Sequence, residues 1–267
     1  MSRLEDLSLE VEQRQVGQGQ PDQMKLGEQK WEHRAGSLNV KKNFGRYFVC
    51  FTDDYSRKSW LFVLKRKNEV FNTFVRFKTA VENQTGAKIK TLWTDRGGEY
   101  LSNAFKAYCL QESLHRQLTV AYSSYQNGVA EHKHRTLMDR ARSMALSCKV
   151  PGFLWGETIA TANFLVNVSP TVSNNGLTPE ERFTGHKPDL SRLRTFGCRA
   201  YVHPLGAKLD KLQPRAVRCI LVGYDSQSKA YRCYSPDTKK ILISNNVVFD
   251  ETILGDLALA NSTDDIM

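Results

Sequence analysis

The chain has 267 residues, 40% of them hydrophobic and 25% charged, which are ordinary proportions for a globular protein. No apolar run reaches the ~18 residues that a membrane-spanning helix needs, and the charged N-terminus argues against a secretory signal. Lysine and arginine number 38 against 28 aspartates and glutamates, which gives a net charge of +10. This excess suits a polyanion such as nucleic acid, because neutralised phosphates release their counterions; the alternative is a basic surface that only maintains solubility.

Six cysteines, at positions 50, 109, 148, 198, 219 and 233, are spaced widely along the chain. None forms a CxxC pair or a Cys/His cluster with the spacing of zinc ligands. We therefore expect reduced, mostly buried thiols and a protein of the nucleus or the cytoplasm, where thiols stay reduced.

Residues 1–44 have the composition of a poorly ordered segment. Glutamine recurs through them with glycine between, and few apolar side chains are available for a core. Such a stretch buries too little apolar surface to offset its chain entropy. We predict that this segment is poorly ordered and precedes the folded domains.

From position 45 the sequence alternates between strand and helix patterns. Apolar runs bounded by turn residues predict strands, and apolar residues at intervals of three and four predict amphipathic helices. Strands are predicted over 47–52, 59–64, 88–93 and 117–120, and helices over 68–84, 102–112 and 129–148. This order is that of an RNase H-like α/β core whose first strand is missing from the series.

The last third of the chain changes from helical to β patterns. An apolar helix is predicted over 153–167, and a short one begins at Thr178, where a capping residue, a proline and two acids follow one another. Beyond about Leu193 the pattern consists of short strands and turns. We predict a core domain over 45–190, a small β domain over 191–252 and a loose tail over 253–267.

Two acids stand at the ends of predicted elements. Asp95 follows the strand 88–93, Glu131 opens the helix 129–148, and the 35 residues 96–130 separate them. Two-metal phosphoryl transfer needs carboxylates from distant parts of the chain, because Mg²⁺ takes oxygen ligands and a metal pair clamps the attacking and leaving oxygens. The alternative is a strand-end aspartate before a Gly-Gly turn and a glutamate that complements a helix dipole.

The helix 129–148 is amphipathic and basic. Its apolar side includes Leu137 and Ala141, together with the aliphatic stem of Lys133. The residues largely off that side are His132, Arg135, Asp139, Arg140 and Arg142. A basic face beside an acid would hold DNA phosphates by charge-assisted contacts; the alternative is an ordinary solvated face. We expect no zinc site at His132 and His134, because positions i and i+2 of a helix do not face each other.

Five blocks of the sequence resemble the integrase of copia-type retrotransposons, with its D,D-35-E set of carboxylates. They are YFVCFTDDYSR from Tyr47, TDRGGEY from Thr94, QNGVAEHKHRT from Gln126, FGCRAY from Phe196 and VVFDE from Val247. The resemblance runs from about Arg46 to Glu251. It implies an RNase H-like mixed sheet flanked by helices, followed by a small all-β SH3-like barrel.

The resemblance also implies nucleic-acid binding and polynucleotidyl transfer for DNA integration. It implies that Asp95 and Glu131 are catalytic and hold Mg²⁺, or Mn²⁺, if the site is competent. It further implies DNA contacts, and these would come from Gln126, Asn127, Gly128, Lys133 and Arg135. The expected partners are DNA and a second copy of the chain, with no membrane.

One part of the family pattern is missing. The first catalytic aspartate of the family stands on the first strand before a Cys-Gly-Pro turn, and no such segment precedes Tyr47. Counting back without gaps places Glu32 near that position, in a stretch without an apolar strand. Loss of the aspartate would weaken the attraction of two metal ions, and loss of its strand would leave neighbouring strands with unpaired edges. We expect either a substitute strand from residues 25–44 or a defective core.

Three hypotheses follow from these residues. The first is an integrase remnant that keeps its fold and binds DNA, with strand transfer lost or impaired. The second is an active integrase in which Glu32 is the third metal ligand. The third is a domesticated DNA- or protein-binding module without catalysis.

Overall fold

The computed structural model describes residues 23–30 by their backbone, and also 45–94, 100, 102–118, 128–203, 215–225 and 228–254. The loose tail predicted over 253–267 lies outside these ranges from residue 255 on. Within the described chain, no helix combines the length and the apolar character needed to cross a membrane.

The first sheet has five strands in the order β3-β2-β1-β4-β5. They are β1 (Gln23–Lys30), β2 (Tyr47–Asp53), β3 (Ser59–Leu64), β4 (Thr91–Thr94) and β5 (His115–Leu118). The pairs β1–β2 and β2–β3 are antiparallel, whereas β1–β4 and β4–β5 are parallel. This mixed sheet with its antiparallel hairpin is the RNase H-like arrangement that the sequence predicted.

The central strand, β1, comes from the segment that we predicted to be poorly ordered. Its residues pair with all of β2, from Met24 opposite Asp53 to Lys30 opposite Tyr47, and with β4 on the other side. A substitute strand was expected within 25–44, and the strand begins two residues earlier, at Gln23. Main-chain pairing on both sides explains why a segment with so few apolar residues is held in the sheet.

One face of this sheet is covered by α1 (Val70–Thr85), which follows a 3-10 turn at Lys67–Glu69. Phe51 of β2 stacks on Phe77 of α1 with ring centroids 4.4 Å apart. The helix ends at Gly86, whose φ of 69° is the left-handed conformation that glycine adopts freely at a helix C-terminus. Next to α1 lies α2 (Asn103–Gln111), capped by the Ser102 hydroxyl, which accepts from the Phe105 N–H.

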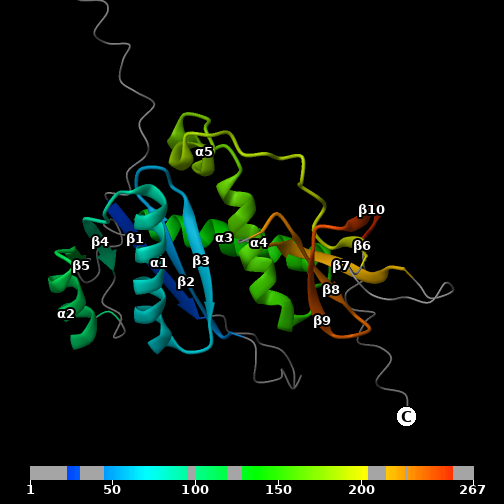
Figure 1. The fold of residues 1–267 in the computed structure, drawn as a ribbon, viewed down its shortest axis with the longest axis horizontal. Coiled ribbons are helices and arrows are strands. Elements are labelled where there is room, and N and C mark those ends of the chain that lie inside the picture. The colour runs from blue at the N-terminus through cyan, green and yellow to red at the C-terminus, as the bar shows by residue number, and fades with distance from the viewer. Residues whose placement is uncertain are drawn as a thin grey trace, which may run out of the picture.

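The opposite face is covered by α3 (Gly128–Ser147) and α4 (Trp155–Asn167). Phe48 and Cys50 of β2 pack there with Leu137 and Ala141 of α3 and Ile159 of α4. Three short elements follow α3 in the chain: η3 (Gly152–Leu154), η4 (Val172–Asn174) and α5 (Pro179–Thr184), the last capped by Thr178 as predicted. Figure 1 shows α3 and α4 between the first sheet and the second.

The second sheet also has five strands, in the order β10-β6-β7-β8-β9. They are β6 (Cys198–Val202), β7 (Val217–Tyr224), β8 (Tyr231–Ser235), β9 (Lys240–Ser244) and β10 (Val247–Leu254). All of its pairings are antiparallel. Its core holds three of the buried, free cysteines, one each on β6, β7 and β8.

The second sheet is packed directly on the first domain. Ile220, Val222 and Tyr234 form one buried cluster with Cys148 and Leu154. Arg232 of β8 donates two hydrogen bonds of 2.7 Å to the Glu157 carboxylate of α4, and the Thr161 hydroxyl donates to the Val222 carbonyl. These contacts join the two sheets into one body.

Gly197, just before β6, marks the closest approach at this junction. Its φ is +80°, and a Cβ at this position would lie 2.5 Å from the Cys148 sulfur. We expect Gly197→Ala to lower the free energy of unfolding by about 1–3 kcal/mol more than Gly176→Ala, because only the former adds a clash. Gly176 is the matched control, since its φ is +84° and no atom lies within 4 Å of its would-be Cβ. Urea denaturation of both variants measures the difference, and equal losses would show that the close packing contributes nothing.

Candidate nucleic-acid and metal site

Some residues predicted for the site belong to the described part of the chain, and others do not. Asp95, Gln126 and Asn127 lie outside it, as does Glu32. Gly128 is described by its backbone as the first residue of α3, and Glu131 follows in the first turn with an exposed side chain. The site is therefore built from α3 and from the strands on which it packs.

The two sides of α3 differ as the sequence predicted. Leu137 and Ala141 are buried against β2, whereas the five polar residues expected off that side are exposed. Arg142 forms an ion pair of 3.2 Å with Asp139 on this exposed side, and both side chains are 62% exposed. Such a surface pair contributes little to stability, so its guanidinium stays available to another anion.

Lys133 lies on the inward side of α3 and is 8% exposed. Its Nζ donates a hydrogen bond of 2.7 Å to the Arg57 carbonyl oxygen, in the turn between β2 and β3. Burial lowers the pKa of this ammonium to about 8; the Cys50 thiol opposes that effect, and Arg140 and Arg57 add to it. The Lys133 ammonium is therefore not at the surface where the DNA contact was expected, whereas Arg135 is exposed.

His134, the next residue, is half-buried against the core. Its ring meets the Phe48 ring edge-on, with centroids 5.0 Å apart. Burial lowers its pKa to about 4, and its Nε2 has no hydrogen-bond partner among the described residues. Among the described residues, no group of three or more His, Cys, Asp or Glu side chains is placed to hold a metal ion.

The register of β1 fixes which residues of β2 lie beside it. Gly27 pairs with Cys50 and Glu28 with Val49. Cys50 belongs to the cluster beneath α3, whereas Val49 belongs to the cluster beneath α1. Successive residues of β2 therefore face opposite layers of the molecule.

A two-metal site needs several carboxylate oxygens. The sequence of β1 contains one acid, Glu28, and Asp95 lies outside the described residues. The described groups that act on the Lys133 ammonium are Cys50, Arg140 and Arg57, none of them a carboxylate.

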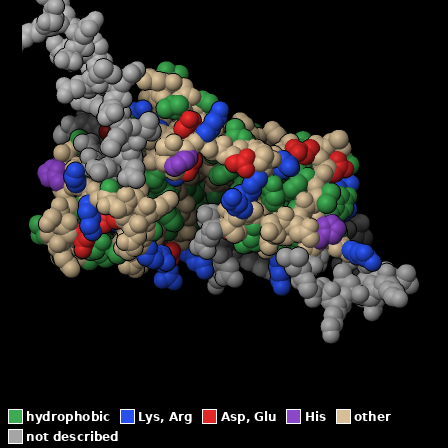
Figure 2. Space-filling model, turned by 45° about the horizontal axis from the view of Figure 1, so that its top comes forward, with side chains coloured by type: hydrophobic (Ala, Val, Ile, Leu, Met, Phe, Trp, Pro, Cys, Tyr) green, Lys and Arg blue, Asp and Glu red, His purple; other side chains and the backbone are tan. Residues whose placement is uncertain are grey.

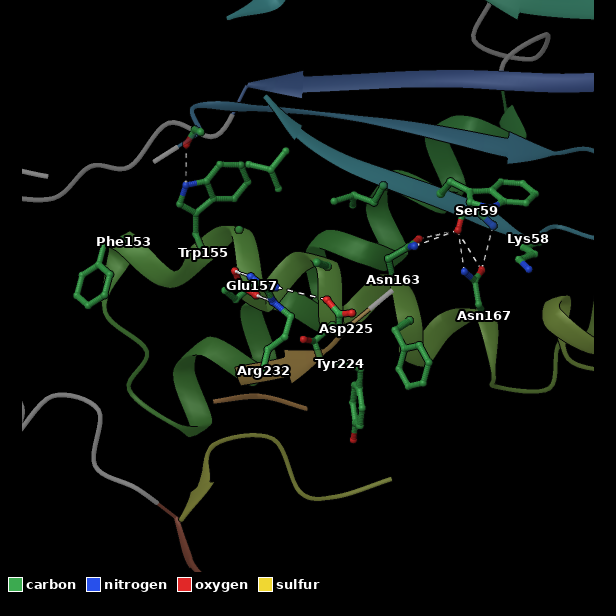
Figure 3. Close-up of a pocket in the computed structure, with 18 residues that line it drawn as sticks. Lys58, Ser59, Phe153, Trp155, Glu157, Asn163, Asn167, Tyr224, Asp225 and Arg232 are labelled. Carbon is green, nitrogen blue, oxygen red and sulfur yellow. Dashed lines mark hydrogen bonds and ion pairs between the residues drawn. The ribbon is translucent and has the colours of Figure 1, made fainter. Parts of the chain in front are cut away.

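The structure also has a cavity of about 470 Å³ beside α4, between β3 and the second sheet. Figure 3 shows that its polar side chains are directed at one another: Asn163 and Asn167 bond Ser59, and Glu157 bonds Arg232. The remaining lining is largely aromatic and apolar. The two acids of the lining, Glu157 and Asp225, both form ion pairs with Arg232.

Comparisons with known proteins place the chain in a family. The family model of the retroviral polymerase SH3-like domain matches residues 198–262. The Retrovirus-related Pol polyprotein from transposon TNT 1-94 of Nicotiana tabacum is 41% identical over 219 residues, which are 82% of this chain. This chain belongs to the copia-type Pol polyprotein family. It contains the integrase core of that family followed by its SH3-like domain.

Other relatives and one solved structure are similar. The Pol polyprotein from transposon RE1 of Arabidopsis thaliana is 32% identical over 77% of this chain, and a truncated Ty1-A Gag-Pol polyprotein of Saccharomyces cerevisiae is 25% identical over 79%. The chain spans only 16%, 14% and 18% of the tobacco, Arabidopsis and yeast polyproteins. The HTLV-2 integrase catalytic core domain, in complex with magnesium, aligns with 61% of this chain and 97% of its own at 14% identity and a TM-score of 0.45.

The neutral His134 predicts a pH dependence of stability. Its pKa is about 4 in the folded chain, against an ordinary value of 6.5, so protonation favours the unfolded state. The stabilisation is complete above pH 6.5 and is lost as the pH falls towards about 4, with a loss of up to roughly 3 kcal/mol.

Urea denaturation between these pH values measures this loss. We expect a flatter curve for His134→Gln than for the unmodified chain, and no such flattening for His132→Gln on the exposed side of α3. Parallel curves for the unmodified chain and His134→Gln would contradict the assignment of a buried, neutral imidazole.

Proposed function

We propose that this chain is a DNA-binding integrase relative in which polynucleotidyl transfer is lost or severely impaired. The observation that carries this proposal is the sequence of the central strand β1, in which Glu28 is the only acid and no aspartate occurs. In-line phosphoryl transfer by two metals depends on carboxylates that hold both ions. With Asp95 and Glu131 alone, the positioning of Mg²⁺ or Mn²⁺ would be too weak for efficient strand transfer.

The evidence for DNA binding is the positive charge of the chain, and it does not depend on a bound metal ion. The chain carries a net charge of +10, and Arg135 and Arg142 lie on the exposed side of α3. Basic and acidic side chains are dispersed over the face shown in Figure 2, so the positive excess is not gathered there. We place the DNA on the outer side of α3, where backbone phosphates would meet guanidinium groups.

The proposal includes DNA as the partner and a second copy of the chain as a further one, as expected for the family. It includes a location in the nucleus or the cytoplasm, which the six free and buried cysteines support. A binding module without a DNA role is the competing function, and its signature would be the absence of a salt-dependent interaction with DNA.

A nuclease assay tests the loss of catalysis. Labelled DNA with the terminal sequence of the host element is incubated with the chain and Mg²⁺ or Mn²⁺. We expect no removal of 3′-terminal nucleotides and no strand joining above background. Processing that disappears in the Asp95→Asn variant would overturn the proposed loss, because it would show a working carboxylate site.

Paired charge reversals test the DNA surface. We expect Arg135→Glu with Arg142→Glu to weaken DNA binding by roughly an order of magnitude and to reduce its salt dependence, because phosphate contacts are lost. Fluorescence anisotropy at several salt concentrations measures both effects. Arg66→Glu with Arg76→Glu is the matched control, since both residues are exposed and belong to the α1 side of the molecule. Equal losses in the two double variants would contradict a surface on α3.

A further inference from the structure

The strand β3 forms an edge of the first sheet. Among the described strands it pairs only with β2, so one side of its main chain points away from the sheet. The Asp53 N–H donates to the Lys58 carbonyl, and the residue pairs that exchange hydrogen bonds recur at every second position from there. The N–H and C=O groups of Ser59, Leu61 and Val63 therefore point outward.

The first of these three positions is completed by side chains of α4. The Ser59 N–H donates to the Asn167 side chain at 3.0 Å, and the Ser59 carbonyl accepts from the side-chain amides of Asn163 and Asn167. Figure 3 shows both asparagines directed from α4 at Ser59. Two amides thus occupy the place that a neighbouring strand would take at this point of the edge.

The next two positions, Leu61 and Val63, have no such partners among the described residues. One and two turns before Asn163, α4 carries Ala160 and Gly156, whose side chains have no polar group, and a Cβ at Gly156 would lie 3.5 Å from the Val63 methyl groups. Leu61 and Val63 line the cavity of about 470 Å³, where Val63 is 40% exposed and Ala160 is exposed. Open main-chain donors and acceptors therefore border an apolar groove, an arrangement that an added strand completes.

The groove is basic at the end where β3 stops. Arg46, whose N–H donates to the Leu64 carbonyl, is exposed there together with Lys65 and Arg66. No acid among the described residues forms an ion pair with these three side chains, and the one acid of the turn, Glu69, accepts from the Lys65 N–H. The charged residues that line the cavity already form ion pairs. The uncompensated positive charge of the groove therefore lies at this end and suits an acidic partner.

We propose that the groove between β3 and α4 binds an extended segment of a partner protein, which adds to the edge of β3 as a further strand. In antiparallel pairing, two residues of the segment, with one residue between them, exchange main-chain hydrogen bonds with Val63 and Leu61. Paired residues share a face of a sheet, so these two side chains enter the cavity beside α4 and are apolar. The N-terminal end of the segment lies at the basic end of the groove, so acidic residues precede the first apolar one. This interaction requires neither DNA nor metal and is independent of the proposed function.

A dye-labelled peptide of sequence DEDVTVTS tests the main-chain pairing in the full chain, with binding followed by fluorescence anisotropy. We expect saturable binding that weakens as the salt concentration rises. N-methylation of the second valine should weaken binding about tenfold, because its N–H points at β3 and a main-chain hydrogen bond is lost. N-methylation of the threonine between the two valines is the matched control. The N–H of that threonine points away from β3, so the affinity should change little.

Filling the groove tests its position. Ala160→Trp places a large side chain between α4 and the edge of β3, and we expect it to abolish peptide binding. Ala80→Trp adds the same side chain at an exposed position of α1 and should leave binding unchanged. The melting temperatures of both variants are measured first, and the N-methylated peptides keep the proposal testable if Ala160→Trp does not fold.

Charge reversals separate this groove from the DNA surface. We expect Lys65→Glu with Arg66→Glu to weaken peptide binding about tenfold and to leave DNA binding unchanged, because the acidic end of the peptide loses its partners. We expect Arg135→Glu with Arg142→Glu to weaken DNA binding and to leave peptide binding unchanged. Equal losses of peptide affinity in the two double variants would contradict the basic end of the groove.

Several results would overturn the inference. A folded chain that does not bind DEDVTVTS saturably would do so, and so would equal losses of affinity for the two N-methylated peptides. A dimer of the chain that Ala160→Trp separates would assign the groove to a second copy, and displacement of the peptide by unlabelled DNA would assign it to nucleic acid. Peptide binding without DNA binding would instead contradict only the proposed function, so the two failures are distinguishable.

Discussion

The core domain depends on main-chain pairing at β1. Without this strand, β2 and β4 would have unpaired edges in the middle of the sheet, and the hairpin β2–β3 would lose its connection to β4 and β5. Hydrogen bonds between strands require an extended backbone but little of the side chains. A segment with two apolar residues, Met24 and Leu26, therefore meets the structural need. Metal binding is a separate requirement, because it depends on a particular carboxylate side chain.

Because of this separation, the fold does not depend on the residues that a metal site would need. Phe51 and Phe74 of the α1 side, and Phe48 and Leu137 of the α3 side, pack on strands whose identity is set by pairing. These contacts do not involve the carboxylates that a metal site would need. The architecture is thus maintained by many weak apolar contacts, whereas metal chemistry would be maintained by a few acids.

Much of the fold was predictable because its signals are local. The periodicity of residues 68–84 and 129–148 marks α1 and α3 within two residues of their observed ends, and Thr178 marks the start of α5. Predictions failed where the bounds of an element are set by its pairing with strands that are distant in the sequence. The strand predicted over 117–120 lies at 115–118, because His115 pairs with Thr91 of β4. β1 has only weak alternation, so the sequence signalled disorder, and its place follows from the two neighbours it joins.

The exposed side of α3 was predictable from the sequence, but the contacts of its buried side chains were not. The exposed side of α3 follows from helical spacing, and so does the inward stem of Lys133. The position of the Lys133 ammonium does not, because its acceptor, the Arg57 carbonyl, is supplied by a turn 76 residues away in the chain. The register that places Gly27 beside Cys50 is also a long-range property. Both facts concern which groups meet in space, and a sequence pattern does not contain that information.

The junction between α4 and the second sheet has a consequence for how the chain can be divided. Its buried cluster takes Leu154 from one domain and Ile220 and Tyr234 from the other, so neither domain has a complete water-facing surface of its own. A protein cut between Thr184 and Cys198 would present these side chains to solvent, and it would break the ion pair between Glu157 and Arg232. The two halves would then be prone to aggregate. In the intact chain, the SH3-like part therefore covers apolar side chains of the core domain.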